Sequence, residues 1–132
     1  MAWIRAMGDK AQKITLISKD STVTANIDSN GVLTFSRVGA YGVSAGYPQD
    51  TLTTLLTFKC PAGTTINISD SGNTQYYSYH IYLDGVEVAS VVRQPAPMTL
   101  TYIATATGVI EIKIKNDALS SGGTNATGSA IA

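Results

Sequence analysis

The chain has 132 residues, enough for one domain with its own core, and its nine basic and nine acidic side chains give a net charge of zero. This balance argues against nucleic acid as a partner, because binding phosphates needs a basic excess. No apolar run approaches the length of a membrane span, so we expect no membrane insertion. Charged residues make up only 14% of the chain. Ser, Thr, Asn and Gly carry most of its polarity.

The start of the chain carries a charge at Arg5 and has no apolar run of signal-peptide length. We therefore expect synthesis in a cytoplasm, without a signal peptide. Cys60 is the only cysteine, so no disulfide forms within a chain, and its apolar neighbours predict a buried thiol. The turns around Asp28 and Asp70 offer too few carboxylates for calcium, and we expect neither a metal nor a cofactor.

Apolar and polar side chains alternate with a two-residue period along most of the chain, whereas no segment sustains a helical period. The predicted strands lie, in chain order, at about 13–16, 22–27, 32–38, 52–60, 65–69, 75–83, 86–92, 99–105 and 109–115. Turn residues separate them at the spacing typical of sandwiches. The pattern predicts an all-β fold: an antiparallel β-sandwich of Greek-key or jelly-roll type with about eight to nine short strands.

Three segments are expected along the chain. Residues 1–11 form an N-terminal arm, and residues 12–117 form the sandwich domain. From about residue 118 to 132 the composition shifts to Ser, Gly, Thr and Ala without periodicity. This predicts a C-terminal tail that is flexible or that is ordered only by a partner.

The clearest local signal is Asp84-Gly85 between two strand patterns, which predicts a two-residue hairpin with a type I′ turn. Such a turn fixes the pairing of the two strands. The expected opposite pairs are Leu83 with Val86, Ile81 with Val88 and Tyr79 with Ser90.

The other face of this hairpin carries the candidate ligand-binding side chains, which are Tyr76, His80, Tyr82, Glu87 and Arg93. Aromatic rings stack on the apolar face of a sugar while polar neighbours bind its hydroxyls, so a glycan site is one interpretation. Tyr and Arg are also enriched as anchors at protein interfaces. A third interpretation is that these residues only stabilise the hairpin, since aromatic residues favour strands in any case.

A glycine-rich loop at 39–48 carries two further candidates, Tyr41 and Tyr47. Loops of this composition form adaptable recognition surfaces. The alternative is a plain connection between the two sheets.

Signals for catalysis are few. His80 is the only histidine, so a Ser-His-acid triad would have to be built on it, and no nucleophile-elbow, Walker or dinucleotide motif is present. We expect no catalytic residues and no enzyme activity.

The first eight residues, Met-Ala-Trp-Ile-Arg-Ala-Met-Gly, resemble the starts of small virion proteins encoded by prophages of Gram-positive bacteria. The remainder is similar in composition to phage head-fibre, tail-accessory and baseplate β-sandwiches. The resemblance implies a structural or adhesive, virion-associated part of a phage-like particle, with other virion proteins and a cell-surface glycan as partners. It further implies a homo-oligomer, preferably a trimer, with Trp3 and Ile4 as an assembly anchor. The alternative function is a free-standing carbohydrate-binding module that uses the aromatic sheet face.

Overall fold

The computed structural model describes residues 13–132. The predicted arm at 1–11, with Trp3 and Ile4, therefore lies outside the described residues. The strands, in chain order, are β1 (Thr15–Lys19), β2 (Val23–Ile27), β3 (Leu33–Tyr41), β4 (Leu52–Cys60), β5 (Thr65–Asp70), β6 (Tyr77–Leu83), β7 (Val86–Val92), β8 (Met98–Ile103), β9 (Gly108–Asn116) and β10 (Gly122–Ile131). Two short 3-10 turns, η1 (Val43–Ala45) and η2 (Thr74–Tyr76), lie between them. In this part of the chain no helix is long and apolar enough to cross a membrane.

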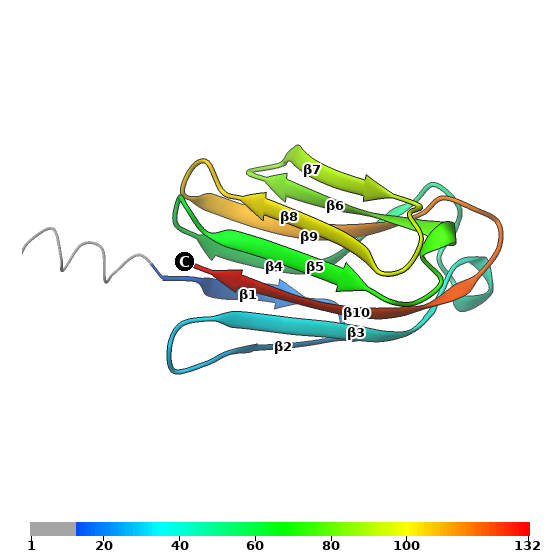
Figure 1. The fold of residues 1–132 in the computed structure, drawn as a ribbon, viewed down its shortest axis with the longest axis horizontal. Coiled ribbons are helices and arrows are strands. Elements are labelled where there is room, and N and C mark those ends of the chain that lie inside the picture. Colours follow the sequence, from blue (N-terminus) through cyan, green and yellow to red (C-terminus); the bar gives the residue numbers. More distant parts are fainter. Residues whose placement is uncertain (1–12) are drawn as a thin grey trace, which may run out of the picture.

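The strands form two antiparallel five-stranded sheets packed face to face (Figure 1). Sheet A has the order β1-β4-β9-β6-β7, and sheet B has the order β2-β3-β10-β5-β8. Strands β3 to β10 are divided between the sheets in the pattern of an eight-stranded jelly roll: consecutive strands lie in opposite sheets, except for the hairpin partners β6 and β7, which share sheet A. Strands β1 and β2 each add one edge strand. The predicted antiparallel sandwich is thus confirmed, with ten strands in place of eight to nine.

The tenth strand corrects the prediction of a flexible tail at 118–132. Strand β10 lies in the centre of sheet B, hydrogen-bonded to β3 on one side and to β5 on the other (red in Figure 1). Its inward side chains are small, with Ala126 and Ala130 both buried. Gly, Ser, Thr and Ala carry almost no contrast in hydropathy, so the alternation that reveals the other strands is absent here although burial alternates.

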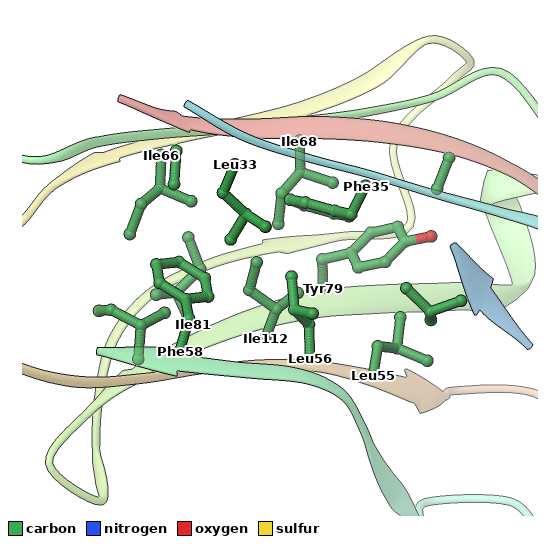
Figure 2. Close-up of a cluster of buried hydrophobic side chains, with 14 of the residues drawn as sticks. Leu33, Phe35, Leu55, Leu56, Phe58, Ile66, Ile68, Tyr79, Ile81 and Ile112 are labelled. Atoms are coloured by element: carbon green, nitrogen blue, oxygen red, sulfur yellow. The ribbon is translucent and has the colours of Figure 1, made fainter. Parts of the chain in front are cut away.

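The core lies between the sheets and is built from the inward half of each alternating strand. Figure 2 shows Leu33, Phe35, Ile66 and Ile68 of sheet B facing Phe58, Ile81 and Ile112 of sheet A. In the predicted strand at 109–115, Ile110, Ile112 and Ile114 alternate with charged residues, which predicts that they face inward, and all three are fully buried in β9. Cys60 is buried as expected, and burial raises the pKa of its thiol.

The hairpin of β6 and β7 turns at Asp84 (φ 49°) and Gly85 (φ 83°), as a type I′ turn requires. Leu83 opposes Val86 as predicted. A β-bulge between Ile81 and Tyr82 then shifts the register by one residue. The observed pairs are therefore Ile81 with Ala89 and Tyr79 with Val91, and not the predicted Val88 and Ser90.

Candidate functional site

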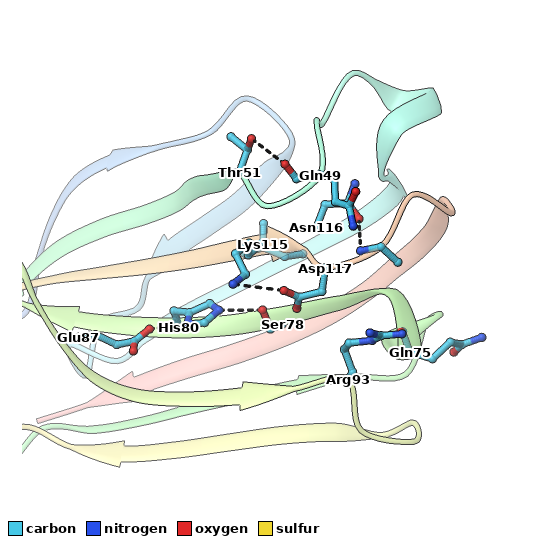
Figure 3. A network of polar contacts seen from close by, with 12 residues as sticks. Gln49, Thr51, Gln75, Ser78, His80, Glu87, Arg93, Lys115, Asn116 and Asp117 are labelled. Atoms are coloured by element: carbon cyan, nitrogen blue, oxygen red, sulfur yellow. Dashed lines mark hydrogen bonds and ion pairs between the residues drawn. The ribbon is translucent and has the colours of Figure 1, made fainter.

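The outer face of sheet A brings together three of the predicted ligand-binding residues, His80, Tyr82 and Glu87. The Ser78 hydroxyl is hydrogen-bonded to Nε2 of His80 at 2.7 Å, and Nδ1 of the same ring contacts the Glu87 carboxylate. Lys113 Nζ lies 4.6 Å from the centroid of the Tyr82 ring. Figure 3 shows Ser78, His80 and Glu87 in line along this face.

This connectivity is the one that a Ser-His-acid triad uses, with the hydroxyl on Nε2 and the carboxylate on Nδ1. Two observations separate it from a working triad. Ser78 is fully buried, so a substrate carbonyl has no access to its oxygen. In addition, β6 is paired on both sides, with Ser78 opposite Val92 and Lys115. The strand pairings therefore occupy the backbone amides that an oxyanion hole would need.

Tyr76 and Arg93 do not join this face. Tyr76 ends η2, before β6 begins, and its ring packs against the core. Arg93 follows β7 with a left-handed backbone (φ 48°), and its Nε donates to the Gln75 carbonyl at 2.8 Å. Figure 3 shows Arg93 beside Gln75, toward the opposite end of β6 from Glu87. These two residues were expected on the same face as His80, and they do not reach it because regular β6–β7 pairing runs only from Ser78 opposite Val92 to Leu83 opposite Val86.

The two loop tyrosines also differ from the prediction, because they pack inward. Tyr41 ends β3 and is 1% exposed, and its hydroxyl donates to the Ile114 carbonyl at 3.2 Å. Burial raises the pKa of Tyr41 to about 12. Tyr47 stacks on it with ring centroids 4.4 Å apart, and the Arg37 guanidinium lies 5.5 Å from both centroids. The loop is thus anchored by its tyrosines and does not display them.

Arg37 was not singled out by the sequence, yet it organises this end of the sandwich. Its guanidinium is buried and donates to the hydroxyls of Thr22, Thr124 and Tyr47 and to the Ala40 carbonyl. These four hydrogen bonds give the buried guanidinium acceptors for its N–H groups. None of the acceptors is a carboxylate of the described part of the chain. The cluster is a structural support of the loop.

The outer face of sheet B has a different chemistry. Strand pairing places ten small, uncharged side chains in two rows that cross all five strands. The hydroxyl row is Thr24, Ser36, Thr127, Ser69 and Thr99, and the mixed row is Asn26, Thr34, Ser129, Asn67 and Thr101. We call the surface formed by these two rows the sheet B face.

A trough runs between the two rows. It consists of two grooves of about 380 and 320 Å³ that share Thr127 and Gly128 at the centre of the sheet. Its floor is formed by the residues between the rows, whose side chains point into the core, including Ala25, Phe35 and Ile68. Both rows line each groove, so the rows form the two walls of the trough.

The side chains of the sheet B face keep most of their hydrogen-bonding capacity free. Within residues 13–132, the one side-chain hydrogen bond among the ten runs from Thr101 Oγ1 to Asn67 Oδ1 at 2.8 Å. The remaining eight make no side-chain hydrogen bond to the described part of the chain. A face of neutral groups that are free to donate and accept is suited to an uncharged, hydroxylated ligand.

The sequence predictions missed this face. Its signal was present in part, because Thr, Ser or Asn occupies alternate positions of the predicted strands at 22–27 and 65–69. The face became visible only when the strand order joined five segments distant in sequence, with the unpredicted β10 in their centre. In the described residues, no three His, Cys, Asp or Glu side chains converge on a point that could hold a metal ion.

Comparisons with known proteins find similarity in structure but not in sequence. No family model matches the chain, and no curated protein matches it. The structure is similar to PliG of Aeromonas hydrophila, a periplasmic inhibitor of g-type lysozyme, with a TM-score of 0.56 and 12% identity over 79% of this chain and 91% of the inhibitor. At this identity the likeness shows a shared fold and nothing of function.

Two looser alignments are to carbohydrate-binding modules. One is the CBM36-1 domain of a xylanase from the hindgut metagenome of Trinervitermes trinervoides, with a TM-score of 0.44 and 10% identity over 92% of this chain and 97% of that domain. The other is the C-terminal CBM6 of LamC, a marine laminarinase from Zobellia galactanivorans, with a TM-score of 0.43 and 8% identity over 90% of this chain and all of that module.

Proposed function

We propose that this protein is a non-catalytic carbohydrate-binding module whose ligand lies on the sheet B face. The observation that carries the proposal is the trough between two rows of uncharged side chains, eight of which have no side-chain partner in the described part of the chain. Ser and Thr hydroxyls both donate and accept, as sugar hydroxyls do. The proposal takes up the carbohydrate-binding module that the sequence analysis gave as the alternative function, and it moves the site from the aromatic face of sheet A to sheet B.

The composition of the sheet B face favours a glycan over other ligands. Protein interfaces are enriched in aromatic residues, Met and Arg and depleted in Ser, whereas the two rows consist of Thr, Ser and Asn alone. The rows also lack the Lys and Arg that nucleic-acid phosphates require. A neutral polyhydroxylated ligand matches both features.

The test is a broad glycan array probed with the protein and three variants. Thr127→Lys places a long side chain where the two grooves meet, and Thr57→Lys makes the same change on the outer face of sheet A. Tyr82→Ala removes the aromatic ring of the sheet A face. We expect the wild type, Thr57→Lys and Tyr82→Ala to bind the same glycans, and Thr127→Lys to lose them while keeping its circular dichroism spectrum. Wild-type binding to no glycan, or binding that Tyr82→Ala abolishes and Thr127→Lys spares, would overturn the proposal.

A place in a phage-like particle stays a prediction. It rests on residues 1–8, which lie outside the described part of the chain, and on composition. It is compatible with glycan binding, since the receptor-binding part of a particle can hold a sugar. Light scattering behind a sizing column tests it through the predicted trimer, whose mass would be three times 13.8 kDa.

A further inference from the structure

The trough in the sheet B face has a direction, and this direction restricts its ligand. Neighbouring strands lie about 4.8 Å apart, so a row across five strands is roughly 19 Å long, while the two rows stand about 7 Å apart along the strands. A ligand that crosses the strands can contact all ten side chains. A ligand that follows one strand meets only the few row residues on either side of it.

The two grooves divide the trough into two halves of similar size. One half is lined from β2 and β3, the other from β5 and β8, and they meet on β10 at Thr127 and Gly128. Gly128 is required there because a Cβ would come within 2.1 Å of the Phe35 ring. Phe35 is one of the residues that line the β2–β3 half, where it adds apolar floor for the carbon-bound hydrogens of a sugar.

The two walls of the trough differ in their hydrogen-bonding groups. The hydroxyl row offers five groups that each donate and accept. In the mixed row, Asn67 Oδ1 is already occupied by the Thr101 hydroxyl. This bond fixes the amide and leaves its Nδ2 free to donate. The two edges of a bound chain therefore meet different partners.

The charge of the ligand is restricted as well. None of the ten row residues is ionisable, so the carboxylates or sulfates of an acidic glycan would lose hydration on this face without gaining a cationic partner. The two rows flank the floor on both sides, so a ligand chain can extend along the axis of the trough, whereas a branch would have to pass over a row of side chains.

Resting on the proposed function, we infer that the sheet B face binds an uncharged, unbranched polysaccharide whose chain crosses the strands and fills two subsites that meet at Thr127 and Gly128. Short oligosaccharides fill one half of the trough, and longer ones fill both.

The experiment is isothermal titration with neutral linear gluco-, xylo- and manno-oligosaccharides of increasing length, beside oligogalacturonates as charged counterparts. We expect affinity to rise about tenfold or more from the disaccharide to the length that fills the trough, and then to level off. Oligogalacturonates should bind at least about tenfold more weakly than the best neutral series of equal length.

Two matched variants separate the halves of the trough. Ser36→Leu changes the β2–β3 half and Ser69→Leu the β5–β8 half, and both residues lie on interior strands of sheet B. Each variant should bind the long oligosaccharide about tenfold more weakly than the wild type, and its affinity should level off at a shorter oligosaccharide length. Disaccharide affinity should change by less than about threefold, because a disaccharide can still fill the unchanged half. Affinity that does not depend on length, or equal binding of the charged series, overturns this inference while glycan binding itself stands. Binding of no glycan on the array overturns the proposed function and this inference together.

Discussion

The Tyr79 hydroxyl donates a hydrogen bond of 2.6 Å to the Asp70 carboxylate, from β6 of one sheet to β5 of the other. Asp70 is fully buried and also accepts from the Tyr77 hydroxyl at 2.9 Å and from the backbone N–H groups of Gly72 and Asn125. Four donors thus take the place of water around one carboxylate. The cluster joins the end of β5 to both β6 and β10.

Replacing Asp70 by Asn should lower the free energy of unfolding by about 3 kcal/mol. The Asn side chain has an NH2 group in place of one carboxylate oxygen, and this NH2 group would face hydroxyl and N–H groups that now donate to Asp70. Urea denaturation measures this loss. The matched control is Asp50→Asn, at an exposed residue whose positive φ suits Asn equally well. Equal effects of the two substitutions would contradict the structural role of the Asp70 cluster.

Alkaline pH should destabilise the fold through its buried tyrosines. Burial raises the pKa of Tyr41 to about 12 and also raises the pKa of Tyr77 and of Tyr79, and the nearby Asp70 carboxylate adds to the rise for the latter two. In the unfolded chain these hydroxyls ionise near pH 10. Above that pH the unfolded state binds fewer protons than the folded state, so stability falls as pH rises.

The expected slope is up to about 1.4 kcal/mol per pH unit for each such tyrosine. Urea midpoints measured from about pH 8 to about pH 11.5 should therefore be constant at first and then decline. Tyr41→Phe should make the decline shallower, because it removes one of the buried hydroxyls whose pKa is raised. A stability that is constant over the whole range would refute this prediction.

Local sequence signals predicted the strands but not their neighbours. The alternation of Ile110, Ile112 and Ile114 with charged residues was enough to place β9 and its inward face. Strand β10 could not be found this way, because small residues bury little apolar area and leave no hydropathy contrast. Its place between β3 and β5 depends on how Gly128 fits between Phe35 and Ile68, where a Cβ would meet the Phe35 ring, and this fit is a property of the assembled sheet.

The candidate sites were likewise predictable from the sequence only where neighbouring segments form them. Sequence placed His80, Tyr82 and Glu87 on one face because a hairpin sets register locally, although the bulge after Ile81 was not foreseeable from residue types. The sheet B face combines Thr24, Thr127 and Thr99, which are far apart in sequence and meet only through strand order. A site made by one hairpin is therefore predictable in part, and a site made by five strands is not.

The turn at Asp84-Gly85 gives a test of backbone strain alone. Gly85 has a φ of 83°, and a Cβ placed there would have open space around it. Gly85→Val should thus lower the free energy of unfolding by about 1–3 kcal/mol through the cost of a left-handed β-branched residue. Gly85→Asn, which tolerates this conformation, should cost much less. A Val variant as stable as the wild type in urea would show that the turn is not of type I′.

The Ser78–His80–Glu87 network should support the sheet and perform no hydrolysis. Ser78 is buried, and its strand is paired with β7 and β9, so neither a carbonyl carbon nor an oxyanion has a place to bind. Hydrolysis of 4-nitrophenyl acetate by the wild type should equal that by Ser78→Ala and by His80→Ala. Ser78→Ala should instead lower stability by about 1 kcal/mol, because His80 loses its hydroxyl partner. Ester turnover that both substitutions abolish would make this network catalytic and would overturn the non-catalytic assignment.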